Sequence, residues 1–87
     1  MMNVYAIFDK KTSFSQELLV MPNDDVAKRY FGNFVSGLAE SNKASVIVSY
    51  PEDFDFYRIG SYNPDTGEII SCKPDFLLNA GSIIRKE

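Results

Sequence analysis

The sequence has 87 residues, which is enough for one ordinary domain but not for two. Hydrophobic residues make up 45% of it and the formal net charge is only −3, a balance that excludes an intrinsically disordered chain. Proteins that hold nucleic acid by charge alone are usually basic, so this acidic balance argues against purely electrostatic binding. The absence of histidine excludes histidine-based acid–base catalysis and histidine-ligated zinc.

Cysteine content and hydropathy indicate the cellular compartment of the protein. The single cysteine, Cys72, cannot form an internal disulfide, whereas a small secreted domain usually carries several. No apolar run approaches the roughly 20 residues that cross a bilayer. We therefore predict a single cytoplasmic domain over residues 1–87 with no membrane partner, in which Cys72 is an inert, half-buried strand residue.

The first half of the chain predicts a β-hairpin followed by one long helix. Asn3–Asp9 is rich in β-branched and aromatic residues, and Gln16–Met21 forms a second strand that ends at Pro22. In Asp24–Glu40 the hydrophobic residues recur at three- and four-residue spacing, which is typical of an amphipathic helix. The residues predicted to cover the sheet are Val26, Tyr30, Phe31, Phe34, Val35 and Leu38.

The second half predicts further strands. Ser45–Tyr50 is expected to be a strand, and Phe54–Tyr62 and Glu68–Cys72 are expected to form a hairpin around the turn at Asn63–Gly67. Beyond Pro74, a helix and an extended stretch with one helical turn fit almost equally well. The expected fold class is α+β, with an antiparallel sheet of about four to five strands, one long helix on one face, and the order ββαβββ plus a short C-terminal element.

No cluster of side chains in the sequence predicts catalysis or a cofactor. The acidic groups Asp24/Asp25 and Glu52/Asp53/Asp55 lack the spacing of a calcium loop and lie where a helix cap and a turn are expected. Neither a Gly-x-Ser-x-Gly elbow nor a phosphate-binding loop is present. We predict no catalytic residue, no metal and no cofactor.

The segment Phe54–Tyr62 offers the most informative pattern. Two-residue alternation places Tyr57 and Ile59 against the helix. It places a second set of side chains, three aromatic rings and an arginine, on the opposite face. Aromatic rings with an arginine on an open sheet face are typical of proteins that stack single-stranded bases, whereas the residue types alone favour core packing with the arginine at its edge. The residues on this predicted platform are Phe54, Phe56, Arg58 and Tyr62.

The basic residues are scattered along the chain. Each is ordinarily a solvated surface charge, but together with Arg58 they are candidates to contact phosphates along one edge of the fold. The candidates for phosphate contact are Lys10, Lys11, Lys28 and Arg29, and a further basic pair lies at Arg85 and Lys86.

Four motifs give the sequence a family resemblance. They are V-Y-A-I-F-D-K-K at Val4–Lys11, D-x-V-A-x-R-x-F at Asp24–Phe31, P-E-D-F-x-x-Y-x-I-G-x-Y at Pro51–Tyr62 and N-x-x-T-G at Asn63–Gly67. Together they span most of the chain, and it resembles the small non-structural protein of gokushovirus-type microviruses, which are bacteriophages with single-stranded DNA genomes. The resemblance implies a protein of the bacterial host cytoplasm that acts in genome replication or packaging, by binding DNA. It carries over no catalytic residue.

Two hypotheses of function follow. In the first, a non-enzymatic phage protein binds single-stranded DNA during genome synthesis or packaging; the aromatic segment and the resemblance favour it. In the second, the protein is an interaction module that recruits or inhibits a host or phage replication factor through a sheet edge or an aromatic patch, which the acidic charge favours. A small core and exposed strand edges are also compatible with a homodimer.

Overall fold

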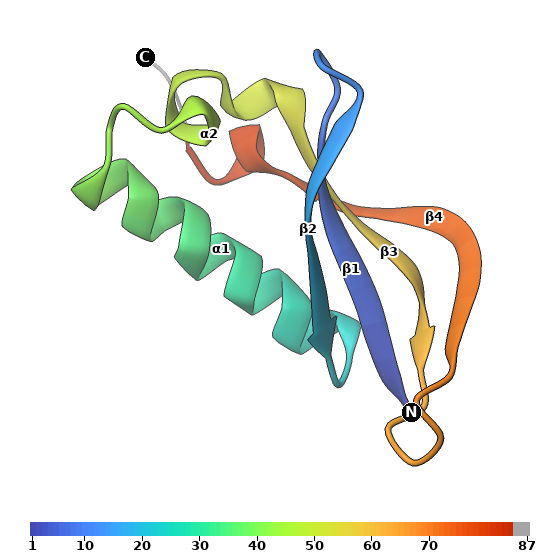
Figure 1. The fold of residues 1–87 in the computed structure, drawn as a ribbon. Coiled ribbons are helices and arrows are strands. Elements are labelled where there is room, and N and C mark those ends of the chain that lie inside the picture. Colours follow the sequence, from blue (N-terminus) through green and yellow to red (C-terminus); the bar gives the residue numbers. More distant parts are fainter. Residues whose placement is uncertain (85–87) are drawn as a thin grey trace.

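The computed structural model describes residues 1–84, and the side chains of all of these except 14–17. Within them an antiparallel sheet is crossed on one face by a long helix, α1, at Asp24–Ser41 (Figure 1). The strand order is β2-β1-β3-β4, so the two outer strands are β2 and β4. This confirms the predicted α+β fold. The strands are β1 (Met2–Asp9), β2 (Phe14–Met21), β3 (Phe54–Tyr62) and β4 (Ile69–Asn79).

Both ends of α1 are satisfied by specific hydrogen bonds. The side chain of Asn23 accepts a bond of 2.9 Å from the backbone N–H of Val26, the arrangement expected of an N-cap residue. Two carboxylates follow in the first turn, where the positive end of the helix dipole stabilises them. At the other end the N–H of Asn42 donates to the carbonyl of Leu38 at 2.8 Å. The predicted helix is confirmed to within one residue.

The core between sheet and helix is organised around three stacked rings. Phe56 of β3 lies between Tyr5 of β1 and Phe31 of α1, with centroid separations of 5.5 Å and 4.6 Å and interplanar angles of 13° and 8°. All three side chains have no exposed surface. Around them are packed the buried residues Ile7, Met21, Ala27, Val35, Ile47, Phe54 and Ala80.

The buried side of α1 is narrower than predicted. Phe31 and Val35 are fully buried, and Phe34 and Leu38 pack partly against the core, as expected. Val26 and Tyr30, however, remain 42% and 43% exposed, so that part of the prediction was wrong. The hydrophobic stripe is wider than the strip of helix surface that a single four-stranded sheet can cover, and its flanks stay in solvent.

The segment predicted as a strand at Ser45–Tyr50 is helical. It forms a short helix, α2, at Val46–Ser49, followed by the 3₁₀ turn η1 at Pro51–Asp53. Both sides of β1 are already taken by β2 and β3, and β4 occupies the free edge of β3. The β-branched residues of this segment therefore find no strand partner beside the central strands, and Ile47 is instead buried in the core.

The C-terminal part is an extended strand followed by one helical turn, the second of the two predicted alternatives. The strand β4 runs to Asn79, and the 3₁₀ turn η2 covers Ala80–Ser82. Pro74 is accommodated because β4 is an edge strand whose register shifts near it. Cys72, in the same stretch, is exposed and not half-buried as predicted. Gly60 lies at a bulge, where an added Cβ would come within 2.5 Å of the carbonyl oxygen of Ile70.

The predicted orientation of β3 was wrong. Phe56 pairs with Ile7 of β1, and both side chains point beneath α1, whereas Tyr57 pairs with Ala6 and points to the other face. Because side chains alternate along a strand, this reverses the predicted sides from Phe54 to Ile59, whereas the register shift beside Gly60 leaves Tyr62 on the face opposite the helix, as predicted. Phe54 and Phe56 are core residues, only 1% and 0% exposed, and cannot stack on a ligand in this conformation.

The orientation of β3 is testable with two matched substitutions. Phe56→Ala should lower the free energy of unfolding by about 3–5 kcal/mol, because it opens a cavity in the ring stack. Phe76→Ala, on the opposite face of the sheet and 53% exposed, should cost less than about 1 kcal/mol. Urea titrations of both variants measure the difference. Equal losses would contradict the assignment of the faces.

Candidate functional site

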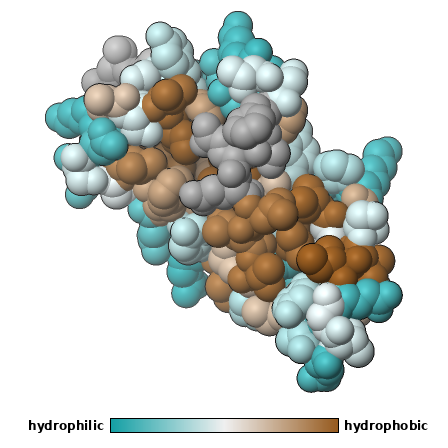
Figure 2. Space-filling model, in the orientation of Figure 1, coloured by the Kyte–Doolittle hydropathy of each residue, from teal (hydrophilic) through white to brown (hydrophobic). Residues whose placement is uncertain are grey.

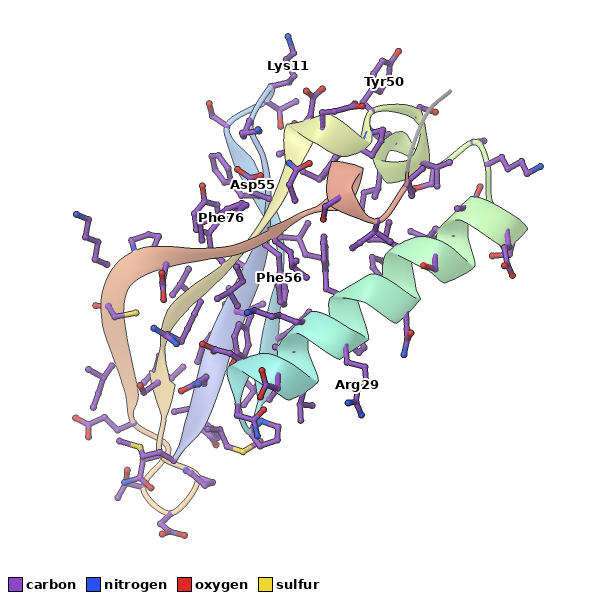
Figure 3. The ribbon with its side chains drawn as sticks, turned by 180° about the vertical axis from the view of Figure 1, so that it is seen from behind. Lys11, Arg29, Tyr50, Asp55, Phe56 and Phe76 are labelled. Carbon is purple, nitrogen blue, oxygen red and sulfur yellow. The ribbon has the colours of Figure 1, made fainter. Side chains whose placement is uncertain are left out.

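The face of the sheet opposite α1 carries a row of aromatic side chains from three strands. Phe8 comes from β1, Tyr57 from β3 and Phe76 from β4. Neighbouring rings meet edge to face, with centroids 6.4 Å apart for Phe8 and Tyr57 and 5.9 Å apart for Tyr57 and Phe76. In Figure 3, Phe76 lies on the side of the sheet away from the helix, whereas Phe56 lies between sheet and helix. We call this surface the open face and the three rings the aromatic row.

A shallow apolar hollow of about 370 Å³ adjoins the aromatic row. Its walls are Ala6 and Ile59 together with Phe8, Tyr57 and Pro74. Figure 2 shows that apolar surface continues across the sheet on this side. Further exposed hydrophobic side chains lie on this face, on β2 and β4. They are Leu18, Val20, Ile69 and Phe76.

The charges of this region lie at its rim. Lys73 is exposed directly before Pro74, which lines the hollow. Lys10 is half exposed, and its Nζ lies 3.8 Å from the buried carboxylate of Asp55. Because this distance is long and the Lys10 side chain is 49% exposed, Lys10 can also meet an anion. Lys11, in the turn between β1 and β2, lies instead with Val46, Tyr50 and Asp53 around a second hollow.

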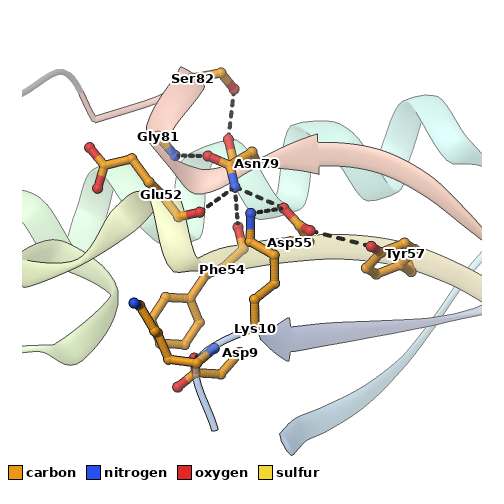
Figure 4. A network of polar contacts seen from close by, with 10 residues as sticks. Asp9, Lys10, Glu52, Phe54, Asp55, Tyr57, Asn79, Gly81 and Ser82 are labelled. Carbon is orange, nitrogen blue, oxygen red and sulfur yellow. Dashed lines mark hydrogen bonds and ion pairs between the residues drawn. The ribbon is translucent and has the colours of Figure 1, made fainter. Parts of the chain in front are cut away.

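Asp55 belongs to a polar network that fastens the end of β4 (Figure 4). The Nδ2 group of Asn79 donates to the carbonyls of Glu52 and Phe54 at 3.0 and 3.2 Å and to Oδ1 of Asp55 at 2.8 Å. The Oδ1 atom of Asn79 accepts from the N–H of Gly81 at 2.8 Å. One amide therefore ties together β3, β4 and both 3₁₀ turns. Asp55, one of the acidic residues of this segment, therefore has a structural role.

The same carboxylate acts on the central ring of the aromatic row. The Tyr57 hydroxyl donates to Oδ2 of Asp55 at 3.3 Å. Burial of the ring, followed by the nearby negative charge of Asp55 and this hydrogen bond, raises the pKa of the Tyr57 hydroxyl above its usual 10. Tyr57 is therefore neutral at physiological pH and held in one orientation.

Arg58 lies on the helix side of the sheet and is engaged by two carboxylates. Its guanidinium donates to Oδ2 of Asp24 at the start of α1 and to Oδ2 of Asp75 in β4, the second at 2.7 Å. Asp24 also accepts from the hydroxyl of Tyr5 at 2.8 Å. Arg58 thus joins α1, β3 and β4. The prediction that it lies on the face of the sheet opposite the helix was wrong.

The other predicted site residues do not come together either. Lys28 and Arg29 are exposed on α1, and Figure 3 shows Arg29 pointing away from the sheet. Tyr62 is half-buried at the end of β3, where it pairs with Met2. Of the predicted phosphate contacts, Lys10 lies near the rim of the open face beside Asp55, whereas Lys11 lies beside Val46 and Tyr50. Arg85 and Lys86 fall outside the described residues.

Sequence reasoning missed three residues of the open face. Phe8 shares its face with Ala6 by simple alternation, a signal that was present but was not connected to a site. Phe76 and Lys73 lie in or beside the segment after Cys72, where no strand was predicted. Tyr57 was recognised as aromatic but was assigned to the wrong face.

The described residues contain neither a metal-binding cluster nor a membrane-spanning helix. Across residues 1–84 no set of three or more side chains of the metal-binding types lies close enough together to hold an ion. In that same part of the chain, no helix has the length and apolar character needed to span a membrane.

Comparison with known proteins places the chain in a phage family. The family model described as "Phage ORF5 protein" matches residues 2–83, so the chain belongs to this family. The chain is also 31% identical over 81 residues to "Protein ORF5" of Chlamydia phage 1, a match that covers 88% of this chain and 81% of that protein. This confirms the resemblance to the small non-structural protein of gokushovirus-type phages. No solved structure matches the chain.

The Tyr5–Asp24 hydrogen bond predicts a loss of stability in alkali. Burial, opposed by the hydrogen bond from Asn3 and reinforced by the Asp24 carboxylate, raises the pKa of the Tyr5 hydroxyl above 10. A raised folded-state pKa means that the contribution to stability is full below pH 10 and is lost as the pH rises through the folded value. Tyr5→Phe should remove part of this alkaline loss and cost about 1–2 kcal/mol at neutral pH. Thermal unfolding measured from pH 7 to 11 tests it, and an unchanged alkaline slope would contradict it.

Proposed function

We propose that this phage protein binds single-stranded DNA on its open face, without catalysis, during genome replication or packaging in the bacterial cytoplasm. The observation that carries the proposal is the aromatic row. Phe8, Tyr57 and Phe76 stand on three neighbouring strands of an uncovered sheet. Sheet faces of this kind stack successive unpaired bases, and each stacked base contributes about 1–3 kcal/mol.

The spacing of the rings supports binding along the sheet. Centroids about 6 Å apart follow one another from β1 to β4, so a strand of DNA that crosses the β-strands meets one ring after another. Phe76 is the most accessible ring, at 53% exposure, while Phe8 and Tyr57 are half-buried. We therefore expect Phe76 to provide the dominant stacking contact and the hollow beside it to receive the edge of a neighbouring base.

Electrostatics sets the strength of this binding. Lys10 and Lys73 flank the open face, and the net charge of −3 disfavours further phosphates. The logarithm of the affinity falls with the logarithm of the salt concentration by about 0.7 for each phosphate neutralised on single strands. Two contacts at the rim give a shallow slope of roughly −1.4 and a weak affinity that depends little on sequence.

A second candidate function is supported by the same surface. The middle of the open face is apolar and has exposed hydrophobic side chains, among them Leu18 and Ile69, as protein-binding surfaces often do. The uncovered edges of β2 and β4 also offer unpaired backbone groups to a partner strand. In this alternative the protein recruits or inhibits a host or phage replication factor and does not bind DNA.

Fluorescence anisotropy with a labelled single-stranded oligonucleotide at two salt concentrations decides between the two. We expect weak binding at low salt. Phe76→Ala should lower the affinity by about 1–3 kcal/mol and leave the salt slope unchanged, because stacking releases no counterions. Lys10→Gln should make the slope shallower by about 0.7.

The matched controls lie on the outer surface of α1. Tyr30→Ala removes a ring that is 43% exposed, and Arg29→Gln removes an exposed positive charge. Neither should change DNA binding, because neither residue borders the open face. No anisotropy change at low salt and high protein concentration would rule the proposal out, and so would an equal loss in Phe76→Ala and Tyr30→Ala.

A further inference from the structure

The open face leaves more apolar surface uncovered than the aromatic row requires. Leu18 is 66% exposed and Val20 46% exposed on β2, on the far side of β1 from Phe76. Both pair with residues of the open face, Leu18 with Ala6 and Val20 with Val4, and so point to the same side. Hydrophobic side chains therefore extend from one edge strand of the sheet to the other (Figure 2).

The charge of this surface limits what can cover it. Asp55 also faces this side, but its side chain is only 7% exposed and is hydrogen-bonded to Asn79 and Tyr57. The described lysines near it, Lys10 and Lys73, lie at a turn and at the bulged edge, outside the apolar middle. A partner that fits the middle of the face must therefore be equally apolar and uncharged.

We propose that a second copy of this chain covers the open face, forming a two-fold dimer in which the two sheets pack face to face. The face supplies both halves of a reciprocal contact. Phe76 is half exposed, and the hollow of about 370 Å³ beside it is lined by Ala6, Ile59 and Pro74. In a two-fold pair the Phe76 ring of each protomer enters the hollow of the other, as an isologous interface requires. Two sheets of identical twist also pack naturally with their strands nearly aligned.

The size of the face indicates a weak dimer. Four strands about 4.8 Å apart and about seven residues long at about 3.3 Å per residue cover roughly 19 by 23 Å. Two such faces bury roughly 900 Å² in total, which is below the 1,200–2,000 Å² of stable complexes. We therefore expect a dimer that forms and separates readily as the protein concentration changes.

Such a dimer would compete with DNA. This step rests on the proposed function, because the rings that stack bases are the same rings that the second copy covers. The two equilibria are then linked, and each ligand weakens the other by the same factor. Single-stranded DNA should convert dimer to monomer, and the apparent affinity for DNA per protomer should fall as the protein concentration rises. The dimer would keep the apolar face out of water until single-stranded DNA is present.

Sedimentation equilibrium over a range of protein concentrations tests the dimer without DNA. The wild-type protein should pass from monomer to dimer as its concentration increases. Phe76→Glu places a charge in the middle of the face and should leave the protein monomeric at every concentration. Tyr30→Glu, which places the same charge on the outer surface of α1, should dimerise like the wild type. Far-ultraviolet circular dichroism establishes that both variants are folded.

The outcomes separate the two proposals. A protein that stays monomeric at the highest concentrations overturns the dimer, and so does a folded Phe76→Glu variant that still dimerises, since the pairing would then use another surface such as the edge of β2. A dimer that single-stranded oligonucleotide does not dissociate, in a protein that binds no DNA, overturns the proposed function and leaves the dimer standing. DNA binding with no change in the dimer shows that the two use different faces and overturns the competition.

Discussion

The stack of Tyr5, Phe56 and Phe31 is the contact on which the rest of the structure depends. It joins the two central strands to the long helix, and each ring lies nearly parallel to the next. Placing Phe56 in the middle of this stack fixes which side of β3 faces the helix. The alternation of the strand then sends Tyr57 to the opposite face, where it meets Phe8 and Phe76. The core and the open face are therefore two consequences of one register.

The polar contacts of the fold serve the same arrangement. Arg58 connects the first turn of α1 to β4 through Asp24 and Asp75. Asn79 closes the other end of β4 against β3 and the two 3₁₀ turns. Asp75 lies in the middle of β4 and Asn79 at its end, so Phe76 is held between these two contacts and Pro74 lies directly before the first of them. The second half of this edge strand is thus fixed, which gives the aromatic row a defined geometry.

A domain of this size has a small core, and yet the described residues leave one whole face of its sheet uncovered. Apolar surface of that extent usually marks an interaction site. Membership of the phage ORF5 family sets the biological context, and the chemistry of the face narrows the ligands to those that stack or pack without charge pairing. Single-stranded bases and a second copy of the chain both meet this condition, which is why the two proposals share one surface.

The sequence by itself determined the elements whose signals are local. The 3.6-residue spacing of hydrophobic residues specified α1, and the β-branched and aromatic run specified β1. Motifs along the chain also identified the family before any fold was known. These features depend on neighbours in the sequence, so a linear pattern is sufficient to find them.

Tertiary structure alone decided the elements that depend on distant partners. Ser45–Tyr50 has the composition of a strand but formed α2, because both central strands were already paired and Ile47 is buried in the core. Both faces of β3 carry aromatic side chains, so alternation alone could not predict whether Phe56 or Tyr57 faces the helix. Pairing with β1 places Phe56 beneath Phe31. The residues of the open face come from strands far apart in the chain, and Phe76 joined them only when β4 extended past Pro74. A site assembled by strand pairing has no signature in the sequence, because its members become neighbours only after the sheet has formed.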